Sequence, residues 1–457
     1  MICGGCGYEA PPEDPFPFRC PNRGDGGDHV MARVLDGRVT LWPTGSEPNP
    51  FIRYRTLSHA YHLAVSRGMT DDQYLELVGD LDRAVARVDG RGFTVTPFAA
   101  RPALAERAGV ADLWVKDETG NVSGSHKGRH LMGLLILLEV VERTGLAGRD
   151  PGRPLAIASC GNAALAAAVV ARAGERPLDV FVPTWAEPAV VTRLEDLGAN
   201  VRVVPRQEGV PGDPTYHALL AAIGEGAIPF TCQGPDNGLT VEGGMTLGYE
   251  LADGARRGDV ALDRLFVQTG GGALASAVVQ GLREAVSLGA LKELPRIQAV
   301  QTVGGYPLAR AYVRLASRIL ERLGEPASMA GSAESADRIL EKAEAPEVQE
   351  ELAAAARDRG SFMWPWETEP ASVATGILDD ETYDWLAVVR GMVETGGFPV
   401  LVSEETLETG NVLARDATGI DVDHTGSAGL AGLLEVTGAG EVDRQERVAV
   451  LFTGIRR

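Results

Sequence analysis

Apolar and polar positions follow two different periods along the chain, which predict short strands separated by amphipathic helices. Apolar runs at 155–159, 179–183, 265–268 and 296–301 have the length and composition of buried strands. Between them, apolar residues recur at helical spacing, as in the Ala-rich segment 163–173. This alternation predicts an α/β fold whose largely parallel sheet is covered by helices on both faces.

Segments outside this alternation differ in character. Residues 71–88 repeat apolar positions at helical spacing and begin with acids, which predicts a helix. Residues 41–60 are rich in proline and aromatic residues, and we expect a connecting segment there. Residues 325–341 and 343–359 are acidic, Ala-rich and helical in pattern, so we expect a solvated excursion at the surface.

Small and polar residues follow several of the predicted strands directly. Examples are Ser159–Asn162, Gly270–Gly272 and Gly304–Gly305. In parallel α/β sheets, ligands bind at the carboxyl ends of the strands. The sequence therefore predicts a ligand site formed by these turns.

The charge balance limits the classes of partner. The 457 residues include 63 acids and 43 lysines and arginines, for a formal net charge of −20. Such a chain has no basic surplus for neutralising phosphates, so neither nucleic acid nor an anionic membrane is expected as a partner. No apolar run reaches transmembrane length and no signal segment precedes the first domain, so we expect a cytoplasmic protein.

The N-terminal cysteines suggest a metal site. Cys3 and Cys6 form a C-x-x-C pair, and Cys20 follows at the distance found in zinc ribbons. A second complete pair is missing, which leaves His29 or Asp28 as candidates for the fourth ligand. Five cysteines in a chain of this length do not indicate a disulfide framework. We therefore predict a structural zinc site, with a degenerate, metal-free remnant as the alternative.

Lys127 is the main catalytic candidate. It lies among small residues in the stretch Asn121–His130, between an apolar-acidic run and an amphipathic helix. A lysine at such a turn is well placed to be desolvated, and its amine can then form a Schiff base with a carbonyl group. The alternative is a solvated lysine at a helix start, where its charge opposes the helix dipole.

Three other elements fit the same cofactor as Lys127. Gly270–Gly272 joins a strand to a helix, where bare backbone N–H groups can hold a phosphate. Asn162 can donate a hydrogen bond to a phenolic oxygen, and Thr453 can place a hydroxyl on a ring nitrogen. An aldehyde, a phenol, a phosphate and a pyridine on one ring describe pyridoxal phosphate.

The glycine-rich turn also matches a rival pattern. Gly270-x-Gly272-x-x-Ala275 fits the dinucleotide fingerprint that follows a strand. That fingerprint requires an acid near the end of the next strand, but the sequence there is Ala299-Val300-Gln301. A dinucleotide would also leave Lys127 and Asn162 without a role, so pyridoxal phosphate is the better interpretation.

Several motifs, in order along the chain, resemble those of the threonine synthase family, which belongs to the fold type II (tryptophan synthase β-like) pyridoxal-phosphate enzymes. The N-terminal cysteines resemble the ribbon that many of these synthases carry. The other similarities lie at Asn121–Arg129 (family pattern N-P-T-G-S-F-K-D-R), Ser159–Ala164, Leu197–Ala199, Glu242–Glu250, Ala371–Ile377 and Leu451–Gly454.

This resemblance implies a domain organisation. We expect a ribbon-like segment at 1–40, a large cofactor-binding domain from 41–125 and 255–457, and a small α/β domain at 126–254. The family also implies a small amino-acid substrate and a homodimer.

The resemblance further implies a role for each matching residue. Lys127 would bind the cofactor and move protons, and Asn162 would contact its phenolic oxygen. The phosphate loop would be Gly270, Gly271 and Gly272 with Ala273 and Leu274. Thr453 would face the pyridine nitrogen, with Ser427 as second choice. Substrate contacts would come from Ser123, Ser125, Ser159, Gly161 and Arg129.

The chain departs from the family pattern beside the lysine. His126 replaces the family's phenylalanine and Gly128 its aspartate. His126 is either a second proton shuttle or a packed histidine facing the ring. A phosphorylated substrate would require nearby cations, for which Arg129 and Lys116 are candidates, although both are also typical ion-pair residues.

Three functions remain open from the sequence. The first is a lyase or synthase of the threonine synthase type, which converts O-phosphohomoserine to threonine and phosphate. The second keeps pyridoxal phosphate but performs β-elimination, as serine or threonine dehydratases and diaminopropionate ammonia-lyases do, or β-replacement. The third is an effector-binding protein without catalysis.

Overall fold

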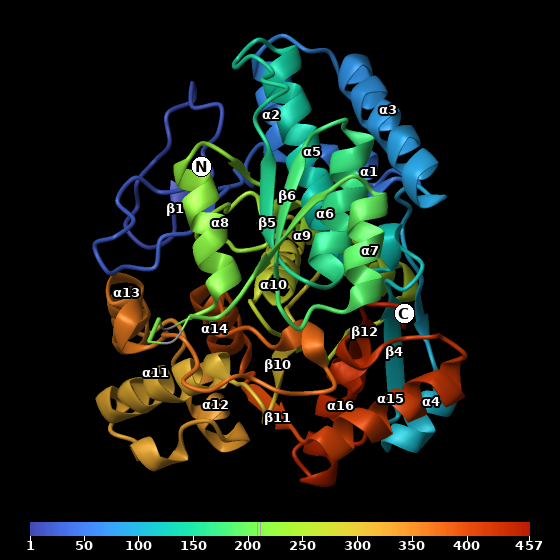
Figure 1. The fold of residues 1–457 in the computed structure, drawn as a ribbon. Coiled ribbons are helices and arrows are strands. Elements are labelled where there is room, and N and C mark those ends of the chain that lie inside the picture. The colour runs from blue at the N-terminus through green and yellow to red at the C-terminus, as the bar shows by residue number, and fades with distance from the viewer. Residues whose placement is uncertain (208, 211) are drawn as a thin grey trace.

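Two parallel-rich sheets organise the molecule. The computed structural model describes residues 1–207, 209–210 and 212–457. One sheet has six strands in the order β11-β10-β9-β12-β4-β3, all parallel except β3, and the other has four parallel strands in the order β7-β6-β5-β8. Figure 1 shows the four-stranded sheet in the upper half of the molecule and the six-stranded sheet in the lower half. The mixed α/β fold class is confirmed.

The strands of the two sheets come from different parts of the chain. The six-stranded sheet contains β3 (Phe98–Ala100), β4 (Asp112–Asp117), β9 (Arg264–Gln268), β10 (Arg296–Thr302), β11 (Pro399–Val402) and β12 (Arg447–Phe452). The four-stranded sheet contains β5 (Leu155–Ala158), β6 (Leu178–Pro183), β7 (Asn200–Val204) and β8 (Ile228–Pro229). A separate antiparallel pair joins β1 (Ile2–Cys3) to β2 (Met31–Ala32). The boundaries expected for the domains stay a prediction.

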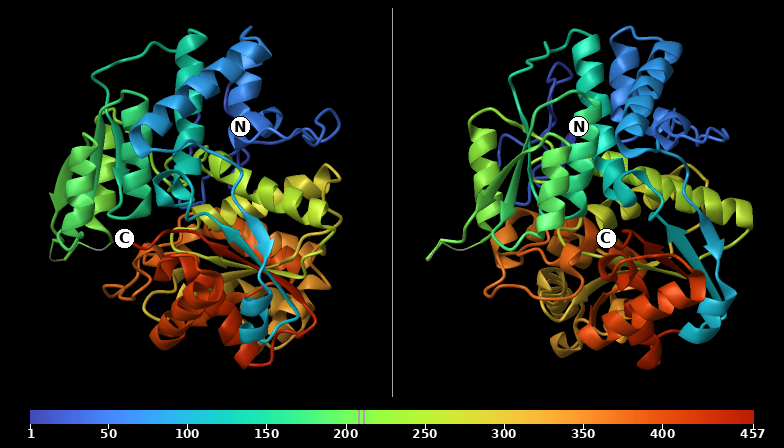
Figure 2. Two further views of the ribbon diagram at one scale, coloured as in Figure 1. Left: turned by 90° about the vertical axis from the view of Figure 1, so that its right-hand side faces the viewer. Right: turned by 45° about the vertical axis from the view of Figure 1, so that its right-hand side comes forward.

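Helices cover both sheets, as the two turned views show (Figure 2). Before β9 they are α1 (Pro50–Arg53), α2 (His59–Ser66), α3 (Asp71–Asp89), α4 (Pro102–Ala108), α5 (Lys127–Arg143), α6 (Asn162–Ala173), α7 (Pro188–Asp196), α8 (Pro214–Gly224) and α9 (Thr240–Gly258). After β9 they are α10 (Ala273–Ser287), α11 (Pro307–Leu323), α12 (Ala333–Leu340), α13 (Pro346–Arg357), α14 (Trp385–Thr395), α15 (Glu404–Thr418) and α16 (His424–Gly438). No helix in the described ranges is both long and apolar enough to cross a membrane.

Local signals account for the ends of the well-predicted helices. The Thr70 side chain accepts the N–H of Gln73, whose side chain in turn accepts the N–H of Thr70, and this capping box starts α3. Gly90 ends α3 with a φ of 81°, a left-handed conformation that glycine adopts without a Cβ clash. Leu77, Val78, Leu81 and other apolar residues of α3 are buried at helical spacing.

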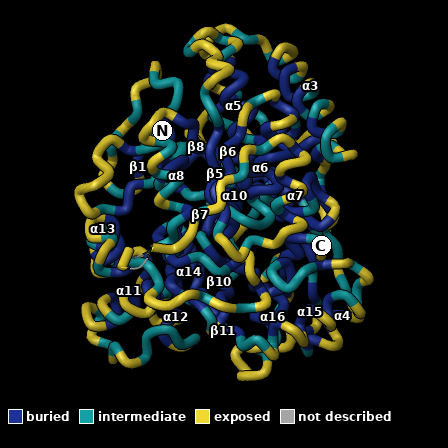
Figure 3. The backbone as a smooth tube through the Cα atoms, in the orientation of Figure 1, coloured by how far each residue is buried: buried dark blue, intermediate teal, exposed yellow. Residues whose placement is uncertain are grey.

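Two expectations about the periphery are wrong in part. The connecting segment at 41–60 contains α1 and the start of α2. The acidic helices α12 and α13 are not simply solvated, because Ile339, Val348 and Leu352 join the main hydrophobic core. Their buried residues are mostly alanines and aliphatic residues, and their acids are exposed except for Glu351, which pairs with Arg318 and Arg322. Figure 3 shows both exposures in α13. Composition alone masked this amphipathic arrangement.

Candidate active site

The strand ends and the start of α5 bring the predicted lysine to the six-stranded sheet. β4 and β12 are neighbours, and the chain continues from β4 into the turn that precedes Lys127. Ser125 forms a β-bridge with Gly454, and the N–H of His126 donates to the carbonyl oxygen of Thr453 at 3.1 Å. Lys127 is the first residue of α5 and is only partly exposed. Thus two segments that are more than 300 positions apart in the sequence lie side by side next to Lys127.

Two carboxyl groups lie near this region, that of the half-buried Asp379 and that of the buried Asp384. Burial raises the pKa of Asp379 to about 6 and that of Asp384 to about 7, and the nearby ammonium of Lys127 offsets part of each shift. The Oδ2 atom of Asp384 accepts a long hydrogen bond, 3.4 Å, from the N–H of Gly234. Its Oδ1 atom is buried without a hydrogen-bond partner in the described part of the chain. Lys127 therefore lies in an acidic environment.

The hydroxyl of Thr453 is suited to a pyridine nitrogen. The Nε2 group of Gln268 donates to two main-chain carbonyls and to Thr453 Oγ at 2.6 Å. Because Oγ accepts this bond, the hydroxyl proton of Thr453 is free to point at an acceptor. The hydroxyl of Ser427 donates instead to the carbonyl of Asp423 and accepts from Asn411. This difference favours Thr453 over Ser427 for the cofactor.

The triglycine turn joins β9 to α10 and contacts a carboxyl group of the protein itself. The N–H of Gly271 donates to the Oδ2 atom of Asp379 at 2.6 Å. Gly272 has a φ of 95°, and a Cβ on Gly270 would lie 2.3 Å from the same carboxylate oxygen. The N–H groups of Ala273 and Leu274 lie in the first turn of α10, where a helix offers them no acceptor. The turn thus has the donors that a phosphate requires.

The remaining candidates lie in two turns. Asn162 opens α6 after β5, and Ser159 and Gly161 precede it in the same turn, where Ser159 Oγ accepts the N–H of Gly161 at 3.4 Å. Ser123 and Ser125 precede α5, and their hydroxyls are buried without partners among the described residues. Both turns lie at strand or helix ends, as expected, and their contacts with substrate stay a prediction.

Several buried polar atoms near these turns have no hydrogen-bond partner among the residues that the structure describes, and they test whether pyridoxal phosphate fits. They include atoms of Ser123, Ser125, His126, His130, Gln268 and Asp384. Buried polar groups in folded proteins are otherwise almost always paired with protein or water. These atoms can make hydrogen bonds to a polar ligand, and the N–H groups at the start of α10 can bind its phosphate. The residues present fit the cofactor.

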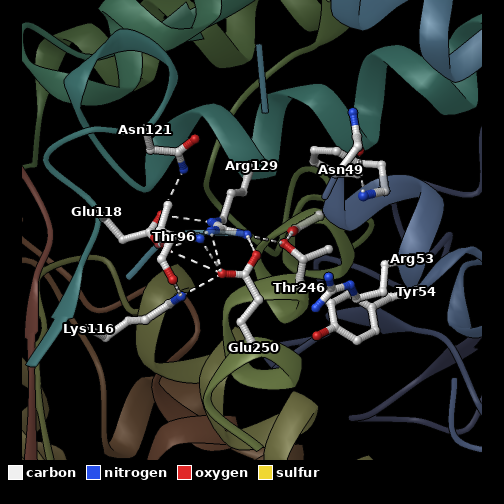
Figure 4. Close-up of polar contacts among 12 residues, drawn as sticks. Asn49, Arg53, Tyr54, Thr96, Lys116, Glu118, Asn121, Arg129, Thr246 and Glu250 are labelled. Carbon is white, nitrogen blue, oxygen red and sulfur yellow. Dashed lines mark hydrogen bonds and ion pairs between the residues drawn. The ribbon is translucent and has the colours of Figure 1, made fainter. Parts of the chain in front are cut away.

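The expectation that Arg129 binds substrate is wrong. Arg129 and Lys116 are fully buried, and both contact carboxylates of the protein itself (Figure 4). Arg129 Nε donates to Glu118 at 2.7 Å and its Nη1 to Glu250 at 2.6 Å, while Lys116 Nζ donates to Glu250 at 2.5 Å. Thr96 supplies further hydrogen bonds to the cluster. These cations tie β4, α5 and α9 together and are not available to a substrate.

The structure favours the packed role for His126. Its Nδ1 atom lies 3.2 Å from the carbonyl oxygen of Thr453, and a carbonyl can only accept, so Nδ1 carries the proton. Burial, together with the charge of Lys127, holds its pKa well below the usual range, so the ring is neutral. His130 packs edge-on against it at 5.8 Å between ring centroids. As a general acid His126 would have to bind a proton that its surroundings disfavour.

Steric crowding accounts for the second departure from the family pattern, Gly128. A Cβ at this position would lie 3.1 Å from the carbonyl oxygen of Val122 and 3.2 Å from the ring of Phe93. The helix start therefore has little room for the aspartate of the family pattern.

Sequence reasoning missed four residues of this site. Gln268, a polar residue at the end of an otherwise apolar strand, was a recognisable signal. Asp379, Asp384 and Arg457 had none, because only the folded chain brings them to the turns of the site. Arg457 donates to the side-chain oxygen of Asn162 and to the carbonyl oxygen of Ser123, the latter at 2.6 Å.

The N-terminal cysteines form a second candidate site. The ligand atoms of Cys3, Cys6, Cys20 and His29 lie within 4.8 Å of one another. His29 Nδ1 faces the Cys3 thiol at 3.4 Å, while Nε2 contacts Asp25 at 2.7 Å, an arrangement typical of zinc-binding histidines. Asp28, the alternative fourth ligand, instead accepts from Trp385 and pairs with Arg359. This geometry is compatible with a tetrahedral zinc site in which His29 is the fourth ligand.

Comparisons with known proteins agree with this site. Residues 91–454 match the family model described as pyridoxal-phosphate dependent enzyme, and the chain belongs to this family. Threonine synthase from Methanosarcina acetivorans is 25% identical over 366 residues, which cover 79% of this chain and 74% of that relative. L-serine dehydratase from Saccharomyces cerevisiae is 28% identical over 224 residues, which cover 48% of this chain and 64% of that relative.

A solved structure shows the same fold over nearly the whole chain. Diaminopropionate ammonia lyase from Escherichia coli superposes with a TM-score of 0.58, covering 94% of this chain and 95% of the other at 15% identity. The chain is therefore a fold type II pyridoxal-phosphate enzyme, similar to threonine synthases, of the kind that performs elimination or replacement on amino acids.

Proposed function

We propose that this enzyme removes an uncharged or cationic substituent from the β-carbon of a small amino acid, as a lyase. The observation that carries this proposal is the charge around Lys127. The ammonium of Lys127 is close enough to Asp379 and Asp384 to lower the pKa of both carboxyl groups, whereas Arg129 and Lys116 are paired within the buried cluster. A dianionic leaving group such as phosphate gains nothing from this environment, while a hydroxyl or amino group is tolerated.

Each residue of the site has a role in this reaction. Bound pyridoxal phosphate supplies an aldehyde for a Schiff base and a ring that stabilises negative charge on carbon. Lys127 would hold the aldehyde, and its Nζ would accept the proton when the Cα–H bond breaks. Asn162 would donate to the ring oxygen, and Thr453 to the ring nitrogen. The first turn of α10 would bind the phosphate.

The neutral hydroxyl of Thr453 favours elimination over transamination. A carboxylate at that position would keep the ring nitrogen protonated, whereas a hydroxyl donor stabilises the unprotonated nitrogen. With Thr453 as its partner, a bound ring would withdraw charge less strongly, which suits loss of the β-substituent. In the overall reaction the Cα–H and Cβ–O or Cβ–N bonds break, and hydrolysis of the unsaturated product yields a 2-oxo acid and ammonia.

A substrate panel tests the proposal. The purified protein, loaded with pyridoxal phosphate, is incubated with L-serine, L-threonine, 2,3-diaminopropionate or O-phosphohomoserine, and 2-oxo acid, ammonia and phosphate are measured. We expect 2-oxo acid and ammonia from at least one of the first three, and none from the Lys127→Ala variant. Phosphate and threonine from O-phosphohomoserine, with no 2-oxo acid from the others, would refute the lyase.

The threonine synthase reaction is the second candidate. It is favoured by the relative from Methanosarcina acetivorans, which matches most of this chain, whereas the serine dehydratase matches about half. In that reaction water replaces the γ-phosphate of O-phosphohomoserine. Cofactor binding without turnover of any amino acid would instead support the effector-binding alternative. The homodimer and the cytoplasmic location stay predictions.

We also propose that the N-terminal segment binds one structural zinc ion through Cys3, Cys6, Cys20 and His29. Support comes from the four clustered ligand atoms and from Asp25, which would orient the histidine. The zinc would be structural, because four protein ligands leave no open coordination position for catalysis.

A further inference from the structure

Arg457 connects the two turns that flank the lysine site. Its guanidinium donates one hydrogen bond to Asn162 Oδ1 and another, of 2.6 Å, to the carbonyl oxygen of Ser123. Asn162 belongs to the turn after β5, and Ser123 belongs to the turn before α5. The chain end lies between the upper and lower parts of the molecule in Figures 1 and 2.

The backbone of Ser123 is strained, and charged side chains hold both of its ends. Its φ of 57° and ψ of 16° lie in the left-handed region, which is unfavourable for a residue with a Cβ. The N–H of Ser123 donates to Asp89 at 3.0 Å, and its carbonyl accepts from Arg457. Strain of this kind persists where the surroundings fix it and is typical of functional sites.

The contact with Asn162 also determines which end of its amide faces the site. A guanidinium can only donate, so it selects the carbonyl end of the amide, Oδ1. The Nδ2 atom then lies on the other side, 2.7 Å from the position that a Cβ on Gly454 would take, next to Thr453. With the amide in this orientation, Asn162 presents a donor beside Gly454, the residue that follows Thr453. If the amide rotated by half a turn, an acceptor would be there instead.

We infer that Arg457 is a positioning residue: it fixes the amide of Asn162 and the strained turn at Ser123, so that Asn162 donates to the ring oxygen of the cofactor. The inference rests on the proposed function, because it assigns the ring oxygen of pyridoxal phosphate to Asn162. A phenolic oxygen that carries negative charge needs a donor and is repelled by an acceptor. Arg457 thus acts on the cofactor through another side chain, without touching it.

The segment before Arg457 is held in place independently. Ile455 donates its N–H to the carbonyl of Gly124, and Arg456 donates its N–H to the carbonyl of Asp421. The side chain of Arg456 pairs with Asp421 at 3.0 Å and is about half exposed. Arg456→Ala therefore removes a charge from the same segment without disturbing the site, and it is the matched control.

The test compares the Arg457→Ala, Asn162→Ala and double variants with Arg456→Ala and the wild type. Absorption spectra and the dissociation constant of pyridoxal phosphate are measured for each. We expect Arg457→Ala to weaken cofactor binding on the order of ten-fold and to shift the absorption of the bound cofactor, since a hydrogen bond to a charged group is lost. Arg456→Ala should behave as wild type. Added guanidinium ion should partly restore the Arg457→Ala spectrum.

The double variant separates this role from others. If Arg457 acts through Asn162, the double variant should match Asn162→Ala, because the second loss has nothing further to remove. Additive effects, or a rise in KM for the amino acid with an unchanged cofactor spectrum, would instead make Arg457 a direct substrate ligand and overturn the inference. A wild-type protein that binds no pyridoxal phosphate would refute the proposed function itself. An Arg457→Ala variant that binds the cofactor as the wild type does would refute only the role of Arg457.

Discussion

Replacing Arg129 by methionine should destabilise the fold without changing recognition of anionic substrates. The side chains of Arg129, Glu118 and Glu250 have no solvent exposure, so the substitution leaves two buried carboxylates with fewer partners. Removing one partner of a buried pair costs about 3–5 kcal/mol. Lys116 still contacts Glu250, so most of the loss falls on Glu118. Methionine fills a similar volume, which keeps the cost of a cavity small.

The assay is thermal unfolding of the cofactor-free protein, followed by circular dichroism. For a chain of 457 residues, a loss of this size corresponds to a fall of roughly 3–5 °C in the midpoint, given typical entropies of unfolding per residue. Arg83→Met is the matched control, because Arg83 pairs with Asp80 on the surface, and an exposed pair contributes about 0–1 kcal/mol. An unchanged midpoint for Arg129→Met, together with a higher KM for an anionic amino acid, would show that Arg129 binds substrate after all.

The same cluster predicts a pH dependence. Burial alone would raise the pKa of Glu118, but the adjacent Arg129 outweighs it and lowers this pKa from 4.5 to about 2. A depressed carboxyl pKa stabilises the fold above the unfolded pKa, and the contribution is lost as the pH falls from about 4.5 to about 2. The wild type should therefore lose more stability over this window than Arg129→Met does, which equilibrium unfolding at each pH can measure.

Three further predictions concern the candidate sites. Asp379→Asn should tighten pyridoxal phosphate binding relative to wild type above pH 6, because the ionised Asp379 competes for the N–H of Gly271 and repels phosphate. Below that pH the ratio of the two dissociation constants should approach one. A ratio that does not change with pH would contradict this. Thr453→Val should weaken cofactor binding on the order of ten-fold, measured by equilibrium titration, because a buried ring nitrogen loses its donor; binding as tight as wild type would assign that nitrogen to another residue. Cys20→Ser should abolish the one equivalent of zinc expected from metal analysis and lower the midpoint of thermal unfolding, whereas an unchanged metal content would exclude the site.

Local sequence signals point to the candidate catalytic elements because the expected chemistry depends on local conformation. A glycine-rich turn after an apolar strand has no side chains, so it can offer a ligand only its backbone, and Gly270–Gly272 is such a turn directly before α10. The turns that contain Lys127 and Asn162 likewise lie at helix starts, as their small residues predicted. The alternation of strands and helices could be predicted for the same reason, because the period of the apolar positions depends on which neighbouring residues are buried.

Roles that depend on a partner far away in the sequence could not be predicted from local patterns. The sequence shows that Arg129 carries a charge near Lys127, but whether that charge meets a substrate or a protein carboxylate depends on Glu250, which lies 121 positions away. The amphipathic face of α12 and α13 was hidden for a similar reason, because an acidic composition does not say which face meets the core.

The sequence by itself determined the class of chemistry: a lysine, a glycine turn, an asparagine turn and a terminal threonine, each in a local conformation that its neighbours impose. Only the tertiary structure decided the charge of the site. Packing buried Arg129 and Lys116 against Glu118 and Glu250, and it brought Asp379, Asp384 and Arg457 to the turns around Lys127. Electrostatic interactions act through space between groups far apart in the chain, and burial strengthens them, so no local pattern encodes them.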